Sequence, residues 1–228
     1  MRAILLLSGG LDSSANLVLA PQSGFTVTQC LTLDYGQRSR MKELAAAASL
    51  AHHFSVPNRV VALPFLAELQ SGLTGREALP HPRRDELDDR AFALESADRV
   101  WVPNRNGVFL EVASALAESS GCGAVVVGFN KEEAATFPDN SQDYLQAINS
   151  ALRFSTRGKV AVVSPTAMLD KTEIVARLKP TTFPWDKLWS CYESGDLMCG
   201  RCESCQRLKR ALDANEVKRD SLFLDQTY

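Results

Sequence analysis

The stretch Ser8-Gly9-Gly10-Leu11-Asp12-Ser13-Ser14 follows directly on the apolar run at residues 3–7. Five apolar residues that end abruptly in Ser-Gly-Gly predict a buried strand running into a tight turn, and residues 15–20 are typical of the first turns of a helix. In such a unit the two glycines let the backbone approach an anion, and the helix N-terminus offers unpaired N–H groups. The sequence therefore predicts a phosphate cradle at residues 8–14, to which three serine hydroxyls contribute.

Asp12 is the one acidic residue of this cradle. A carboxylate beside phosphates repels them unless it holds a magnesium ion or caps the helix, and both interpretations are open. The chain has no Gly-Lys-Ser or Gly-Lys-Thr, which excludes the P-loop of kinases and GTPases, and the spaced glycines of the dinucleotide fingerprint do not fit either. The plain alternative is an ordinary Ser/Gly-rich turn capped by Asp12.

Length and composition narrow the class of protein. The chain has 228 residues, 45% of them hydrophobic, enough for one domain with a substantial core. A net charge of −2 argues against nucleic-acid binding by bulk charge, although it leaves a local basic patch open. No run approaches the roughly 18 apolar residues of a membrane span, and the N-terminal run is too short for a signal peptide. We therefore expect a cytoplasmic protein without a membrane segment.

The pattern downstream predicts an α/β fold. Apolar segments typical of strands lie at 27–33, 59–63, 124–127 and 160–164, and helical patterns lie at 41–54, 108–119, 203–212 and between the capping pair Asp170/Glu173 and Pro180. This alternation predicts a parallel twisted sheet with helices on both faces. We expect a nucleotide-binding core over 1–165 and a helical, zinc-binding region over 166–228. Within the core, 64–100 is rich in Gly, Pro and charge and is expected to be a mobile insertion, either a lid or a partner surface.

Four of the six cysteines crowd near the C-terminus. These four, Cys191, Cys199, Cys202 and Cys205, have a spacing that can close a tetrahedral shell around a structural zinc ion. An iron–sulfur cluster uses closely spaced cysteines too, and disulfides are a third option that a reducing compartment disfavours. The basic residues nearby could read nucleic acid or simply form the solvated face of a helix; they are Arg201, Arg207, Lys209 and Arg210.

Several separate stretches together resemble one family. The first, Ser-Gly-Gly-Leu-Asp-Ser, resembles the pyrophosphatase loop of the N-type ATP pyrophosphatases, which cleave ATP between the α and β phosphates. The others are Asp-Tyr-Gly-Gln-Arg at 34–38, Val-Pro-Asn-Arg-Asn at 102–106 followed by Phe109-Leu110, and Ser190-Cys191-Tyr192 with Cys199-Gly200-x-Cys202-x-x-Cys205. In this order, and over nearly the whole chain, they resemble the 7-cyano-7-deazaguanine synthases, whose fold is adenine nucleotide α-hydrolase-like.

The resemblance implies an ATP-dependent ligase that turns 7-carboxy-7-deazaguanine and ammonia into the nitrile and releases AMP and pyrophosphate. It also implies a homodimer with ATP, magnesium and zinc. The implied catalytic residues are Asp12, Arg105 and Lys171. The implied ATP-binding residues are Leu7, Ser8, Gly9, Gly10, Leu11, Asp12, Ser13, Ser14, Ala15, Asn16 and Leu17. The implied substrate-binding residues are Tyr35, Gln37, Arg38, Arg105, Asn106 and Asp139. As plain alternatives, Arg105 and Lys171 could be surface charges and Asp139 a turn residue.

Two stretches depart from the family's pattern. Asn104 stands where a glycine commonly precedes Arg105, and Ala-Thr-Phe-Pro-Asp-Asn-Ser at 135–141 replaces Ser-Gly-Tyr-Pro-Asp-Cys-Arg and so lacks its arginine. This leaves open a related enzyme that adenylates another carboxylate or joins the deazaguanine acid to another amine. A second alternative is a zinc-bearing binding protein that has lost catalysis, against which the intact Ser-Gly-Gly-x-Asp-Ser argues.

Overall fold

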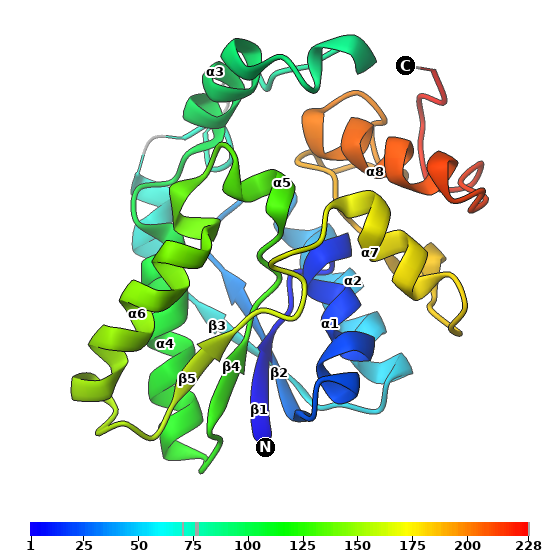
Figure 1. Cartoon of the computed structure of the whole chain (residues 1–228). Coiled ribbons are helices and arrows are strands. Elements are labelled where there is room, and N and C mark those ends of the chain that lie inside the picture. Colours follow the sequence, from blue (N-terminus) through cyan, green and yellow to red (C-terminus); the bar gives the residue numbers. More distant parts are fainter. Residues whose placement is uncertain (70, 76–77, 228) are drawn as a thin grey trace.

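The sheet forms the centre of the molecule (Figure 1). The computed structural model describes residues 1–69, 71–75 and 78–227. Among these residues, five parallel strands lie in the order β3-β2-β1-β4-β5. They are β1 (Arg2–Leu6), β2 (Thr26–Asp34), β3 (Asn58–Ala62), β4 (Ala124–Val126) and β5 (Ala161–Val163). The predicted α/β class with a parallel sheet is confirmed, and each strand lies within two residues of its expected bounds.

Helices cover both faces of the sheet, as predicted. The α-helices in the described ranges are α1 (Leu11–Gln22), α2 (Arg40–His53), α3 (Arg90–Val100), α4 (Arg105–Ser119), α5 (Lys131–Ala134), α6 (Gln142–Ser155), α7 (Lys171–Leu178) and α8 (Glu203–Ala214). Figure 1 shows α1, α2 and α7 on one face and α4 and α6 on the other. Helix α1 begins at Leu11, four residues before the start that the sequence predicted at residue 15. Leu11 itself is buried in the core.

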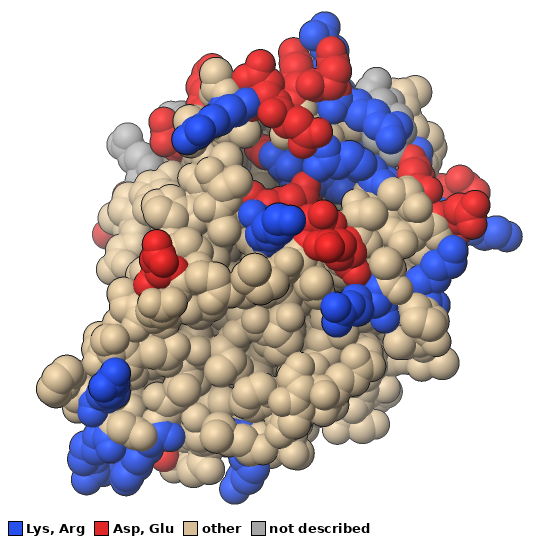
Figure 2. All heavy atoms as spheres, in the orientation of Figure 1, with Lys and Arg blue, Asp and Glu red and all other residues tan. Residues whose placement is uncertain are grey.

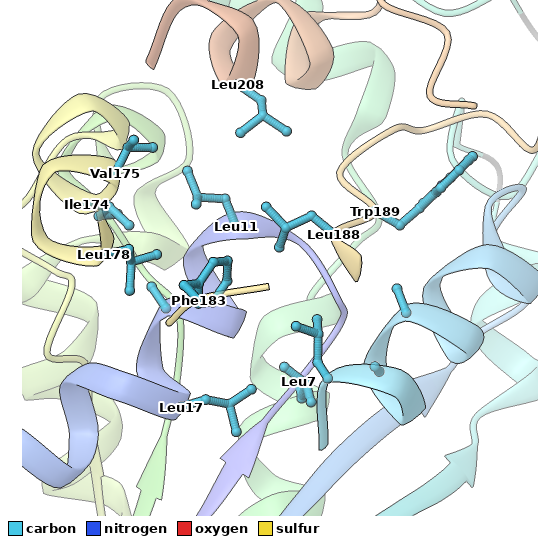
Figure 3. Close-up of a cluster of buried hydrophobic side chains, with 14 of the residues drawn as sticks. Leu7, Leu11, Leu17, Ile174, Val175, Leu178, Phe183, Leu188, Trp189 and Leu208 are labelled. Carbon is cyan, nitrogen blue, oxygen red and sulfur yellow. The ribbon is translucent and has the colours of Figure 1, made fainter. Parts of the chain in front are cut away.

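Alternation along the central strand produces two hydrophobic cores. Ala3 and Leu5 of β1 point into the core shared with α1, α2, α7 and α8, whereas Ile4 between them points into the core shared with α4 and α6. Figure 3 shows part of the first core, where Leu11, Leu178 and Leu208 come from three different helices. The C-terminal helices α7 and α8 therefore pack on α1 and the sheet through apolar contacts. The proposed division into 1–165 and 166–228 stays a prediction.

The strand order fixes where a ligand can bind. The chain runs from β1 outward to β2 and β3, then returns to the other side of β1 to form β4 and β5. The loops after β1 and β4 consequently diverge at the carboxyl edge of the sheet, and such a crevice is where open α/β sheets bind ligands. Gly128, after β4, lets this edge close up, because a Cβ there would lie 2.5 Å from the backbone nitrogen of Ser13. The phosphate cradle is thus packed directly against the loop that follows β4.

The segment 64–100 contains regular structure where the sequence predicted none. Besides two short 3-10 turns, Pro64–Glu68 and Arg84–Glu86, it forms helix α3, whose N-cap Asp89 accepts hydrogen bonds from the next turn at 2.9 and 3.0 Å. The buried residues of α3 include Ala93, Ala97 and Val100, a helical spacing that charged neighbours obscured. Residues 70, 76 and 77 of the expected insertion lie outside the described residues, and its mobility stays a prediction.

Helix α7 starts at the capping pair that the sequence predicted. Asp170 caps α7, and it exchanges hydrogen bonds of 2.8 Å with Glu173 in a capping box.

Across the described part of the chain, none of the helices has the length and apolar character needed to cross a membrane.

Candidate functional site

A cavity of about 280 Å³ opens at the carboxyl edge of the sheet, between the ends of β1 and β4. Its wall includes Ser8, Gly10 and Ser13 of the cradle, and Lys171 at the start of α7. Other lining residues come from α4, from the loop after β4 and from the cysteine region; they include Arg105, Asn106, Phe137, Asn140, Ser190 and Tyr192. The structure therefore brings together stretches that are up to about 180 residues apart in sequence, as the strand order requires.

The cradle has the geometry of an anion site. Gly9 has φ +89°, a conformation that side chains disfavour, and a Cβ there would lie 2.7 Å from Ala46. Gly10 is the N-cap of α1 and supplies no side-chain cap, so no N-cap side chain occupies the helix N-terminus, and the Leu11 N–H donates to the Ser190 hydroxyl. The hydroxyls of Ser8 and Ser13 lie 3.0 Å apart beside the helix N-terminus. These features support the predicted phosphate cradle and leave no capping role for Asp12.

Lys171 lies between two carboxylates at the edge of the cradle. Its Nζ is 2.5 Å from Asp12 Oδ2 and 3.0 Å from Glu133 Oε1, and its side chain is only 6% exposed. The interpretation of Lys171 as a surface charge is therefore wrong. A buried ammonium with two anionic partners is held in one place, which suits a group that must meet a phosphate oxygen.

Burial and ion pairing shift the pKa values of Asp12, Glu133 and Lys171 in opposite directions. Burial raises the pKa of Asp12 although Lys171 pulls it down, whereas Lys171 and Arg207 together outweigh burial and lower the pKa of Glu133. Burial alone would lower the pKa of Lys171, but Asp12 and Glu133 raise it above its ordinary value. Lys171 thus stays an ammonium at neutral pH.

One of the two carboxylate oxygens of Asp12 has no hydrogen-bond partner among the described residues. Its Oδ1 is buried without a hydrogen-bond partner among the described residues, while Oδ2 bonds Lys171. A buried carboxylate oxygen without a partner, in a residue that lines the cavity, is a suitable ligand for magnesium, which binds carboxylates together with substrate phosphates. The residues present therefore fit the ion that the resemblance implies.

The far end of the cavity is aromatic and basic. The Arg105 guanidinium lies 5.7 Å from the centre of the Tyr35 ring and 5.8 Å from that of Phe109, and Nη1 is 3.5 Å from the Tyr35 hydroxyl. Asn106 Oδ1 accepts from the same guanidinium at 3.4 Å. This end offers flat rings and a fixed cation to a planar, anionic ligand.

The other predicted substrate residues lie outside the cavity wall. Gln37 is buried, where it accepts from the Tyr35 backbone and donates to Glu43, so that it supports the Tyr35 loop. Arg38 pairs with Glu193 at 2.9 Å. Asp139 is partly buried close enough to Arg105 to interact with its charge, and its neighbour Asn140 lines the cavity. The binding role of all three stays a prediction.

The predicted ATP-binding stretch extends past the cavity at its C-terminal end. Ala15 and Leu17 are buried in the core under α1. Asn16 donates to the backbone oxygens of Asp12 and Val127 at 3.1 Å, which ties α1 to the end of β4. These three residues support the cradle from behind.

The four predicted cysteine ligands meet in space. Their sulfur atoms all lie within 4.8 Å of one another, with Cys199 and Cys205 3.9 Å apart and Cys191 and Cys202 4.0 Å apart. Sulfurs held about 2.3 Å from a tetrahedral zinc ion are separated by about 3.8 Å, so the donor set fits zinc. Backbone N–H groups donate to the sulfur atoms of Cys191 and Cys199 at 3.3–3.4 Å. All six cysteines are free thiols, and the disulfide alternative is therefore not supported.

The cysteine region is also bonded directly to the cradle. Trp189 donates its backbone N–H to the Gly9 oxygen at 2.9 Å, and the Ser190 hydroxyl accepts from the Leu11 N–H at 3.2 Å. In the sequence, Ser190 and Tyr192 stand out only as neighbours of Cys191, and no site role was predicted for them. Glu133 and Glu43 were missed altogether, because an acidic residue in a helical pattern carries no signal that it will be buried.

The basic residues near the cysteines do not form a solvated face. Lys209 is fully buried, and Arg207 is buried against Glu203 and Glu132. Arg210 pairs with Asp88 at 2.9 Å and with Glu132 at 2.5 Å. The expectation of a solvated helix face is wrong for these three residues, because acidic residues of α5, of α8 and of the segment before α3 pair with Arg207 and Arg210, and Lys209 donates to the backbone oxygens of Asp225 and Thr227. Arg201, which precedes α8, is exposed. Figure 2 shows acidic and basic side chains interleaved over this part of the surface.

Comparison with known proteins places the chain in a family. The family model described as "Queuosine biosynthesis protein QueC" matches residues 2–216. This chain belongs to the QueC family. The resemblance drawn from separate stretches is thereby confirmed, and the cradle, the cavity and the cysteine cluster lie within the matched range.

Curated QueC relatives align over nearly their whole length. The 7-cyano-7-deazaguanine synthase of Desulforudis audaxviator is 50% identical over 92% of this chain and 96% of that protein. Those of Desulforamulus reducens and Methanosarcina mazei are 48% and 44% identical, over 98% and 96% of this chain and 99% and 96% of those proteins. Among solved structures, NMN synthetase from Francisella tularensis aligns with a TM-score of 0.46 and 14% identity, over 96% of this chain and 79% of that chain.

Proposed function

We propose that this chain is an ATP-dependent ligase that converts 7-carboxy-7-deazaguanine and ammonia to 7-cyano-7-deazaguanine, with release of AMP and pyrophosphate. The observation that carries the proposal is a single cavity, in a QueC-family chain, that joins a phosphate cradle, a buried lysine and an arginine flanked by aromatic rings. The four-cysteine cluster is proposed to hold one structural zinc ion. The free thiols suit a reducing compartment, and we propose the cytoplasm.

The chemistry needs activation twice. A carboxylate oxygen attacks the α-phosphorus of ATP and pyrophosphate leaves, which makes that oxygen part of a good leaving group. Ammonia then attacks the carbonyl carbon, AMP departs with the oxygen, and the loss of a proton gives the amide. The amide oxygen then attacks the α-phosphorus of a second ATP and a second pyrophosphate leaves, after which loss of AMP with that oxygen and of both nitrogen-bound protons gives the nitrile. The protein must therefore position reactants and neutralise phosphate charge.

The residues of the cavity are suited to these tasks. The N-terminus of α1 and the hydroxyls of Ser8 and Ser13 would bind the β and γ phosphates. Lys171 would stabilise the charge that develops on the departing pyrophosphate. Magnesium, held by Asp12 Oδ1, would supply further positive charge to the phosphates.

The aromatic end would hold the deazaguanine. Arg105 would bind the carboxylate, and the rings of Tyr35 and Phe109 would offer it an apolar wall. Asp139 is proposed to accept two hydrogen bonds from the guanine-like N–H and amino groups. Asp139 adjoins the cavity wall, because its neighbour Asn140 lines the cavity and donates to Asp139 Oδ1 at 3.2 Å.

The test is a product analysis with purified protein, ATP, magnesium, ammonium and the carboxy-deazaguanine. We expect AMP, pyrophosphate and the nitrile to form together. ADP as the main product would indicate phosphoryl transfer and contradict the proposal. AMP formation with another heterocyclic acid, but none with this one, would favour the related adenylating enzyme that the altered loop at 135–141 leaves open.

A further inference from the structure

One carboxylate joins the zinc-binding region to the catalytic lysine. Glu132, in α5, accepts the backbone N–H of Lys171 on Oε2 at 2.9 Å. Its other oxygen, Oε1, accepts from Arg207 at 3.2 Å and from Arg210 at 2.5 Å, both on α8. The N–H of Lys171 is the first of α7 and has no partner within that helix. Glu132 therefore fixes the point from which the Lys171 side chain starts.

The neighbouring residue fixes the other end of the same lysine. Glu133 Oε1 lies 3.0 Å from Lys171 Nζ, inside the cavity. Two consecutive residues of α5 thus hold Lys171, one by its backbone and one by its ammonium. Any rotation of α5 would move both contacts at once, and a misplacement of about 1 Å can cost a reaction about 100-fold.

Arg207 is built to prevent that rotation. Its side chain is 10% exposed, and each of its nitrogens is bonded: Nε to Glu203 at 3.0 Å, Nη1 to Glu132, and Nη2 to the Leu87 carbonyl at 3.0 Å. A planar guanidinium can bond three acceptors in fixed directions, which an ammonium on a flexible stem cannot. Arg207 is not among the residues that line the cavity, so its bonds are to protein groups and not to a ligand there.

We propose that Arg207 is a positioning residue for Lys171, acting through Glu132. The inference rests on the proposed function, since Lys171 is given its phosphate role there. It assigns the helix that carries two zinc ligands, Cys202 as its N-cap and Cys205 in its first turn, a second task besides closing the metal site. The segment before α3 contributes through the Leu87 carbonyl, so that the expected insertion is attached to the same network.

The experiment compares Arg207→Met, Arg207→Lys and Arg99→Met in the zinc-loaded, full-length protein. Arg99 is a matched control, because its exposed side chain pairs only with Glu95 of the same helix among the contacts of the described residues. For Arg207→Met we expect kcat for AMP formation to fall about 10-fold or more, with the Kd for ATP within about 3-fold of wild type. Arg207→Lys should fall in between, and Arg99→Met should match wild type.

A double-mutant cycle separates positioning from general loss of structure. If Arg207 acts through Lys171, the change Arg207→Met should alter AMP formation by less than about 2-fold when Lys171→Met is already present. Multiplicative losses in the double variant, or an unchanged kcat in Arg207→Met, would overturn the inference. Zinc content and thermal unfolding check the fold. If Arg207→Met does not fold, the same cycle with Arg207→Lys decides. A wild-type protein that forms no AMP would instead refute the proposed function.

Discussion

Lys171→Met removes the ammonium that lies between two partly buried carboxylates, while it keeps most of the side-chain volume. In the wild type, Lys171 Nζ is 2.5 Å from Asp12 and 3.0 Å from Glu133, and the two carboxylates are 18% and 26% exposed. Without the ammonium, two negative charges face each other in a partly dry site. Breaking a buried pair by removing one partner typically costs about 3–5 kcal/mol, and we expect a loss of free energy of unfolding in this range near neutral pH.

The loss should depend on pH with a definite sign. The pKa of Glu133 is lowered in the folded protein, so its contribution to stability is present above its ordinary pKa and is lost as the pH falls. The pKa of Asp12 is already raised by burial, so the folded state gains relative stability as the pH falls through that raised value. In Lys171→Met both carboxylates lose their partner and both pKa values rise. The penalty should therefore be larger at about pH 8 than at about pH 5, where protonation removes the repulsion.

Urea unfolding followed by tryptophan fluorescence, with zinc present throughout, measures this loss at both pH values. Lys179→Met is the matched control, because Lys179 is 48% exposed and lies 3.7 Å from Glu216, which is 90% exposed. Such a surface pair should contribute less than about 1 kcal/mol, without a comparable pH dependence. A penalty in Lys171→Met as small as in the control, or one that grows toward acid pH, would refute the account of this site.

Three further predictions concern the cradle, the metal and the base. Asp12→Ala or Ser8→Ala should abolish AMP formation while circular dichroism stays unchanged; normal turnover would remove the ATP site from the cradle. Each chain should contain one zinc ion, and Cys205→Ser should destabilise the C-terminal region by several kcal/mol, as metal analysis and thermal unfolding would report; iron with visible absorption would contradict this. Asp139→Ala should weaken substrate binding by about 2–3 kcal/mol and leave ATP binding nearly unchanged in calorimetry, and equal substrate affinity would exclude Asp139 from the site.

Much of the fold could be predicted because its signals are local. The apolar run before the cradle and the apolar segments after it could be recognised as strands from their residue types alone. The capping pair at Asp170 and Glu173 marked the start of α7. Helix α3 was missed because Arg, Glu and Asp side chains surround its buried alanines and Val100, so that composition suggested a loop. Its apolar spacing becomes informative only when a surface to pack on is known.

The residues of the candidate site, like the elements of the fold, could be predicted only where their signal is local in the sequence. The cradle and the four cysteines are contiguous motifs whose chemistry is readable from residue types, and the structure brings the cysteine sulfurs together as expected. Glu132, Glu133 and Arg207 could not be found in this way, because their roles arise from the meeting of α5, α7 and α8. The meeting of α5 and α8 explains why Arg207 is buried although the sequence suggested a solvated face, whereas Lys209 is buried where its ammonium donates to the backbone oxygens of Asp225 and Thr227.

The fate of the carboxylate oxygens tests the central claim most directly. The protein is given substrate labelled with ¹⁸O in both carboxylate oxygens, together with ATP, magnesium and ¹⁵N-ammonium, and the products are analysed by mass spectrometry. The account predicts two AMP per nitrile, each AMP carrying one ¹⁸O, and ¹⁵N in the nitrile. Unlabelled AMP, or label appearing in phosphate with ADP as the coproduct, would contradict activation of the substrate by adenylation.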